Sequence, residues 1–161
     1  MIIIGIDPGT TRIGYGVINK EGAKLTYVDS GLLDLPKGTY NERLPGLEKC
    51  LRELVDKNKP ERIGLERLFF VKNQKTGIRV AEARGVILNF FLTRGLPVFE
   101  VTPTEVKLST TGDGRATKQA VMKMVGLFLD LGLVKMVDDA SDALAIAITI
   151  SNKSLLTQEK S

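Results

Sequence analysis

The 161-residue sequence contains no histidine and no tryptophan, and it contains a single cysteine, Cys50. Without histidine, the chain cannot form a Ser-His-Asp triad, a His-activated water or a zinc site of the H-E-x-x-H kind. One cysteine excludes an intramolecular disulfide and a thiolate metal cluster, and it indicates a reducing compartment. Any acid–base or metal chemistry must therefore come from Asp, Glu, Lys and Tyr.

Long apolar runs and targeting signals are also missing. No run approaches the roughly 18 residues that a membrane-spanning helix needs. The first seven residues carry no basic region and are too short for a signal peptide. We therefore expect a cytoplasmic protein.

The overall composition is that of one globular domain. Hydrophobic residues make up 43% of the chain and charged residues 26%, which is ordinary for a folded soluble protein. The net charge of +4 is a moderate basic bias that by itself indicates no particular partner. Since no linker, repeat or low-complexity tract interrupts the sequence, we predict a single domain over residues 1–152 and a flexible C-terminal tail over residues 153–161.

The order of predicted elements indicates an α/β fold. Three consecutive segments read as a strand meander, and two further strands each follow a helix. The predicted strands cover residues 2–7, 14–19, 25–33, 62–66 and 98–101. The predicted helices run from 44 to just before Pro60, over 76–93, about 116–130 and about 139–151, and a capping box at Thr102–Glu105 has the form of a helix start. This order predicts a mixed five-stranded sheet with helices on both faces.

Two carboxylates end strands that are otherwise apolar. Asp7 and Glu66 each follow a glycine by two residues, so each acid shares a strand face with a residue that leaves space beside it. If the two strands are parallel neighbours about 4.8 Å apart, the acids lie side by side. Two carboxylates that close repel each other, and one should protonate unless a cation holds both.

A second acidic pair opens the last predicted helix. Asp139 and Asp142 are three residues apart and so share a helix face, while the adjacent Asp138 stands four residues before Asp142. Any one of these acids has an ordinary structural explanation as a turn residue, a strand-end charge or an N-cap. Four acids that border buried apolar runs instead favour a site with oxygen ligands for Mg²⁺ or Mn²⁺. A protein that holds two such ions together can hydrolyse phosphodiesters.

Several motifs resemble the RuvC family, the bacterial crossover junction endodeoxyribonucleases that resolve Holliday junctions. They occur in the family's order from residue 2 to about 150. The first motif is shared with other RNase H-like proteins, and the combination is specific. The motifs are Gly5-Ile6-Asp7-Pro8-Gly9 with Gly14-Tyr15-Gly16-Val17-Ile18, Glu66 with Phe69 and Lys72-Asn73, Ala83-Arg84-Gly85-Val86, Leu96-Pro97-Val98-Phe99-Glu100, and Asp139-Ala140-Ser141-Asp142-Ala143-Leu144-Ala145-Ile146-Ala147.

The resemblance implies an RNase H-like fold and a metal-dependent nuclease. It implies that two Mg²⁺ ions, with Mn²⁺ as a substitute, are bound by four catalytic acids, and that a homodimer nicks two opposed strands of a four-way DNA junction to leave 5′-phosphate and 3′-hydroxyl ends. It also implies cooperation with the RuvA–RuvB branch-migration complex. The family's spacing selects Asp139 over Asp138 and leaves Asp138 as a helix cap. The four implied catalytic and metal-binding acids are Asp7, Glu66, Asp139 and Asp142.

The resemblance also indicates contacts with DNA. Lys107 and Lys118 match positions that the family uses for the scissile phosphate, although two solvated lysines are the alternative. Phe69 matches a residue that stacks on a base near the opened crossover. We further predict DNA contacts by Lys72, Arg79 and Arg84.

Three other functions are compatible with parts of the sequence. A YqgF-type RNase H-like protein, proposed to process ribosomal RNA precursors, shares the opening motif but fits the Phe69 loop and the last helix less well. An actin-like ATPase has a similar phosphate loop, but this fold normally needs a second lobe and a second loop, and no glycine-lysine Walker motif is present. The complete set of acids argues against a junction-binding protein without catalytic activity.

Overall fold

The computed structural model describes residues 1–9, 12–67, 74–132 and 137–154, and within these ranges the side chains of residues 40–41 and 74–76 are not considered. Five strands form one sheet in the order β3-β2-β1-β4-β5. The first three pair antiparallel, and β1, β4 and β5 pair parallel, as predicted. The strands are β1 (Ile2–Pro8), β2 (Ile13–Glu21), β3 (Lys24–Leu32), β4 (Arg62–Glu66) and β5 (Val98–Val101).

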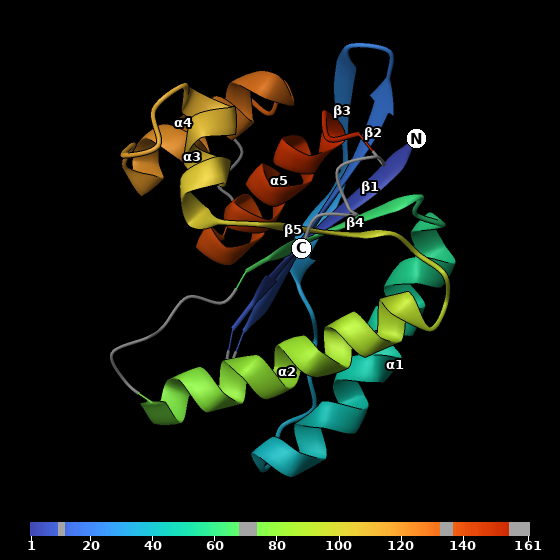
Figure 1. Cartoon of the computed structure of the whole chain (residues 1–161). Helices are drawn as coiled ribbons and strands as arrows, with labels where there is room; N and C mark the ends of the chain where they lie inside the picture. The colour runs from blue at the N-terminus through green and yellow to red at the C-terminus, as the bar shows by residue number, and fades with distance from the viewer. Residues whose placement is uncertain (10–11, 68–73, 133–136, 155–161) are drawn as a thin grey trace.

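Helices cover both faces of this sheet, which confirms the predicted RNase H-like architecture (Figure 1). Two long helices pack on one face and three shorter ones on the other (Figure 1). The first group is α1 (Tyr40–Asn58) and α2 (Gln74–Leu92), and the second is α3 (Pro103–Thr111), α4 (Lys118–Phe128) and α5 (Asp138–Ser151).

Strand β1 contributes side chains to the apolar cores on both faces of the sheet, because side chains alternate between the faces of a strand. Ile4 and Ile6 belong to the apolar cluster under α1 and α2. Ile3 belongs to the cluster under α3, α4 and α5. Asp7 stands four residues after Ile3. Since this separation is even, Asp7 lies on the same face as Ile3, which is the face that α5 covers.

A row of glycines lets α5 lie directly on the sheet. Gly5 pairs with Gly16 on β2 and with Gly64 on β4, so three neighbouring strands present no side chain along one line. A methyl group added at Gly5 would overlap the backbone of Ala143, and one added at Gly16 would lie 2.6 Å from the Leu144 nitrogen. The space predicted beside the acids is therefore filled by helix α5.

Several predicted boundaries need correction, and three of them concern helix ends. Helix α1 begins at Tyr40 rather than at 44, because its first turn is polar and is set by Thr39, whose backbone N–H donates to the Glu42 carboxylate at 2.6 Å. Helix α4 is shorter than predicted. Asp138 is not a cap, because Val137 occupies the N-cap position and Asp138 is the first helical residue.

The chain is packed at least as far as Lys153. The Lys153 ammonium lies 3.1 Å from Glu105, and its carbonyl oxygen accepts a hydrogen bond from Arg62 at 2.6 Å. The rest of the predicted tail, residues 155–161, lies outside the described residues. Among the helices that the structure describes, none has the length and apolarity to cross a bilayer.

Candidate active site

The register of β1 and β4 brings two acids to one end of the sheet. The parallel pairs Gly5–Gly64 and Ile6–Leu65 are the last between these strands, and Asp7 and Glu66 are the next residue on each strand. Strand β1 ends one residue after Asp7 and β4 ends at Glu66, so the two carboxylates stand at the same edge of the sheet. Each is partly buried rather than fully exposed.

Close packing of α5 on the sheet adds two more acids. A methyl group on Gly14, which pairs with Asp7, would lie 2.6 Å from the Asp139 carbonyl carbon. The first turn of α5 therefore rests on the start of β2, and Asp142 follows one turn later on the same face.

The four carboxylates form one electrostatic cluster. Burial, together with the negative charges of Glu66, Asp142 and Asp139 and against a smaller opposing effect of Lys118, raises the pKa of Asp7 to about 7. Burial also raises the pKa of Glu66 and of Asp142. The two acids of α5 that act on Asp7 are Asp139 and Asp142, which are three residues apart.

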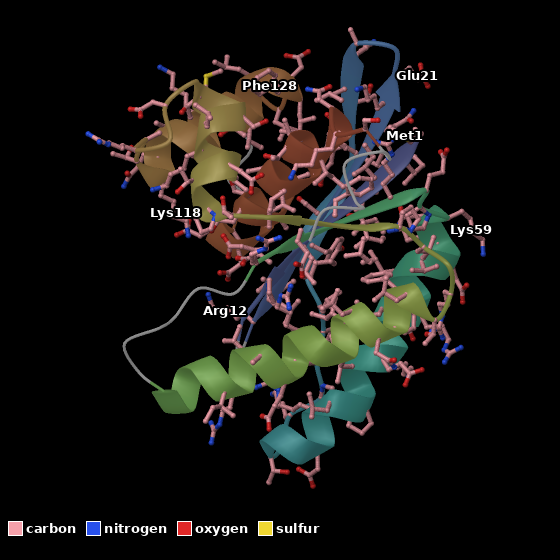
Figure 2. All side chains as sticks on the ribbon, in the orientation of Figure 1. Met1, Arg12, Glu21, Lys59, Lys118 and Phe128 are labelled. Atoms are coloured by element: carbon pink, nitrogen blue, oxygen red, sulfur yellow. The ribbon has the colours of Figure 1, made fainter. Side chains whose placement is uncertain are left out.

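Basic side chains partner the acids of α5. The ammonium of Lys118, the first residue of α4, lies 2.8 Å from the Asp142 carboxylate and 3.8 Å from that of Asp138. The hydrogen bond to Asp142 raises the pKa of Lys118. The Arg12 guanidinium lies 4.0 Å from Asp139. Figure 2 shows Lys118 and Arg12 on the same side of the molecule, away from Met1.

Asp7 and Glu66 have no such partner within the described part of the chain. Since burial and mutual repulsion disfavour their ionised forms, a bound cation would stabilise both as carboxylates. Oxygen donors without histidine or thiolate are the ligands of Mg²⁺ or Mn²⁺. In the described ranges no three acids are yet gathered closely enough to hold one ion together, so water and phosphate oxygens would have to complete each site.

The raised pKa of Asp7 predicts a pH-dependent loss of stability in the metal-free protein. Between the ordinary value of 3.8 and about 7, unfolded Asp7 loses its proton while folded Asp7 retains it. The unfolded state then binds fewer protons, so the free energy of unfolding falls as pH rises through this range. In EDTA, thermal melting of the wild type should therefore fall relative to Asp7→Asn between pH 4 and pH 7. A constant difference between the two proteins would contradict the pKa of Asp7.

The predicted DNA-contacting residues have different surroundings. Lys107 is half-buried on α3, and Arg79 is exposed on α2. Arg84, also on α2, is largely buried and forms an ion pair with Glu100. Phe69 and Lys72 lie outside the described residues.

Sequence reasoning missed two ion pairs at the site, Arg12 with Asp139 and Arg84 with Glu100. Arg12 has no motif that would assign it to Asp139, and the partner of Arg84 is distant in sequence. No local spacing connects these pairs. Arg84 and Glu100 each stand within a quoted family motif, but neither motif indicates that the two residues are paired.

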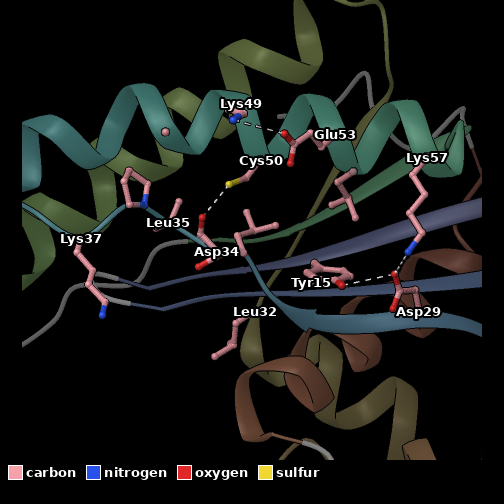
Figure 3. Close-up of a pocket in the computed structure, with 14 residues that line it drawn as sticks. Tyr15, Asp29, Leu32, Asp34, Leu35, Lys37, Lys49, Cys50, Glu53 and Lys57 are labelled. Atoms are coloured by element: carbon pink, nitrogen blue, oxygen red, sulfur yellow. Dashed lines mark hydrogen bonds and ion pairs between the residues drawn. The ribbon is translucent and has the colours of Figure 1, made fainter.

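A separate hollow of about 550 Å³ lies between α1 and the β2–β3 edge (Figure 3). The Lys57 ammonium on α1 lies 2.7 Å from the Asp29 carboxylate on β3, which also lies 3.5 Å from the Tyr15 hydroxyl on β2. Burial and the neighbouring Asp29 raise the pKa of Tyr15. These contacts tie α1 to the edge of the sheet, away from the acidic cluster.

Comparison with known proteins places the chain in a family. The family model for crossover junction endodeoxyribonuclease RuvC matches residues 3–150. The RuvC protein of Brachyspira hyodysenteriae is 44% identical over 154 residues, which are 95% of this chain and 95% of that protein. The RuvC protein of Geotalea uraniireducens is 39% identical over 158 residues, which are 98% of this chain and 92% of that protein.

Solved structures agree with this result. The structure of Thermus thermophilus RuvC in complex with a Holliday junction substrate matches with a TM-score of 0.86 and 31% identity, covering 94% of this chain and 93% of that one. The yeast mitochondrial resolvase Ydc2 matches with a TM-score of 0.68 at 16% identity, covering 91% of this chain and 76% of that one, and so shares the fold. Because the family model and both relatives span nearly the whole chain, the chain belongs to the RuvC family of crossover junction endodeoxyribonucleases.

Proposed function

We propose that this chain resolves four-way DNA junctions by paired symmetric nicks that leave 5′-phosphate and 3′-hydroxyl ends. The observation that carries the proposal is the acidic cluster at the open end of the sheet, in which Asp7 responds to three other carboxylates. The solved complex of the Thermus relative with a Holliday junction supports the substrate. We place the reaction in the cytoplasm, together with the RuvA–RuvB complex.

The carboxylates of Asp7, Glu66, Asp139 and Asp142 would hold two Mg²⁺ ions, with Mn²⁺ as a substitute. When bound, such ions activate the attacking water and stabilise the leaving oxygen of the phosphodiester. The protein's part is to hold the oxygen ligands on two strand ends and one helix, which are rigid supports.

The lysines supply positive charge beside this cluster. Lys118 already lies within hydrogen-bonding distance of Asp142, and its ammonium can therefore stand beside a phosphate bound at the acids. A fixed positive charge at that place stabilises the additional negative charge of the transition state. Lys107 on the adjacent α3 is the second candidate for this role.

A direct test compares three substrates. Purified protein is incubated with a synthetic four-way junction, a matched duplex and an RNA–DNA hybrid, each with Mg²⁺ or with EDTA. A resolvase cuts only the junction, symmetrically and only with metal. Preferential cutting of the hybrid or of RNA would instead favour an RNase H-like relative of the YqgF type.

Paired cleavage predicts a two-fold dimer, because the described part of one chain carries a single acidic cluster. Helix α2 is the proposed interface, since it exposes Ile78 and Leu92 at 60% and 57%. We expect light scattering to show a dimer at micromolar concentration and Ile78→Glu to shift it toward monomer. The matched change Leu127→Glu, at a similarly exposed position on α4, should leave the dimer intact. A monomer with undiminished paired cleavage would disprove the dimer.

Phe69 is proposed to stack on a base at the opened crossover. Phe69→Ala should then remove roughly 1–3 kcal/mol of stacking and slow cleavage about 5- to 150-fold with an unchanged melting temperature. Phe69→Tyr and Phe69→Trp should keep much of the activity. If Phe69 is a core residue instead, the alanine variant loses several kcal/mol of stability and melts at a markedly lower temperature.

A further inference from the structure

An ion pair lies directly behind the end of β4. The Arg84 side chain on α2 donates a hydrogen bond through Nε to the backbone carbonyl oxygen of Glu66 at 3.2 Å. Its Nη2 forms an ion pair with the Glu100 carboxylate on β5. One guanidinium thus connects the helix, the end of β4 and the neighbouring strand.

The surroundings of this pair fix its position. The second carboxylate oxygen of Glu100 lies 3.5 Å from Arg67 Nε, and the carbonyl oxygen of Glu100 lies 3.3 Å from the Lys153 ammonium. The Arg67 backbone N–H donates to the Val101 carbonyl at 2.7 Å. Arg67 and Lys153 therefore hold Glu100, which offers Arg84 a fixed partner.

Glu66 needs such support on its β1 side, because it is still paired with Val101 on β5 but is no longer paired with β1. The last parallel pair between β1 and β4 is Ile6–Leu65, one residue earlier. Without the hydrogen bond from Arg84, the Glu66 carbonyl would have no ladder partner among the described residues on the β1 side. The backbone of Glu66, and with it the carboxylate, would then have more freedom to move.

We infer that Arg84, held by Glu100, is a positioning residue that fixes Glu66 for cation binding rather than a contact to DNA. The inference rests on the proposed role of Glu66 as a metal ligand. Only 17% of the Arg84 side chain is exposed, and its donors are directed at the carbonyl and the carboxylate. A guanidinium suits this task because its planar fork can serve two acceptors at once.

The test measures cation binding without DNA. Metal-free wild type, Arg84→Gln, Arg84→Lys and Glu100→Gln are titrated with Mn²⁺, followed by the electron paramagnetic resonance of free Mn²⁺. We expect Arg84→Gln to weaken Mn²⁺ binding about 10- to 100-fold, as loss of a residue that orients a metal ligand does. Arg84→Lys keeps the charge but has no planar fork, so its affinity should lie between the two, and Glu100→Gln should resemble it.

Junction binding in EDTA separates positioning from DNA contact. If Arg84 is a positioning residue, the affinity of Arg84→Gln for the junction and the dependence of that affinity on salt stay within twofold of wild type. If it contacts a phosphate, junction affinity falls, the salt slope decreases by about 1 and Mn²⁺ affinity is unchanged. That second pattern would overturn the inference, as would a variant unchanged in both assays.

A matched control accounts for the loss of an ion pair as such. Arg52→Gln removes an exposed Arg–Glu pair, 3.0 Å long, on α1, and should leave Mn²⁺ binding and junction affinity unchanged. Melting in EDTA shows whether each variant is folded, and if Arg84→Gln is not, Arg84→Lys and Glu100→Gln decide. Because the Mn²⁺ titration uses no DNA, failure of the wild type to cut junctions would disprove the proposed function without affecting this result.

Discussion

Replacing Asp7 by Asn should lower junction cleavage by several orders of magnitude, about 10³-fold or more, and leave junction binding intact. Asn keeps the size of the side chain but removes the charge of the acid that interacts with all other members of the cluster. Without this charge the metal ions would be held poorly, so the attacking water would not be activated and the leaving oxygen would not be stabilised. Binding persists because it depends mostly on basic groups that meet phosphates. In EDTA above pH 7, where the Asp7 carboxylate is ionised, the affinity should stay equal or rise, since one negative charge facing the DNA is gone.

The same assays on the other acids test the assignment of the cluster. Gel shift in EDTA and cleavage in Mg²⁺ are measured on one junction for variants of Asp7, Glu66, Asp139, Asp142 and Asp138. The first four should bind and fail to cut. Asp138→Asn should be nearly silent, because its only ion pair among the described residues is an exposed 3.8 Å contact with Lys118, and such pairs contribute little. An inactive Asp138→Asn beside an active Asp139→Asn would move the third ligand by one residue.

The second large effect is expected at Gly5, a buried residue of β1. Gly5→Ala should destabilise the protein by roughly 3 kcal/mol or more, because the added methyl group would overlap the backbone of Ala143 in α5, which cannot move aside as a side chain can. The melting temperature should fall by about 6–12 °C. Cleavage should fall as well in the folded fraction, since displacement of α5 separates Asp139 and Asp142 from the strand ends.

Gly126 provides the matched control. A methyl group added there meets no atom within 4 Å, and the residue lies inside helix α4. Gly126→Ala should therefore stabilise the protein by about 0.5–1 kcal/mol through the lower conformational entropy of the unfolded chain. Thermal melting of both variants checks the pair. If Gly5→Ala melts like the wild type, α5 does not rest on the glycine row.

The sequence by itself determined the architecture and singled out the acids that we propose as metal ligands. Strand and helix periodicities are local, so the five strands and most helix positions followed from the spacing of apolar residues. Asp7 and Glu66 could be selected because a charge at the end of an apolar strand after a glycine is costly without a purpose. The absence of histidine limited the metal ligands to oxygen.

Only the tertiary structure decided how the acids are assembled and supported. The register that lines up Gly16, Gly5 and Gly64 across three strands, and so admits α5, is a property of strand pairing rather than of any one segment. The partnerships of Lys118 with Asp142 and of Arg84 with Glu100 join segments that are distant in sequence. The cap of α5 was predicted wrongly for a similar reason. Asp138 has a good capping side chain, but the backbone of Val137 is the one in the extended conformation where the helix begins, and this is set by how the chain enters α5.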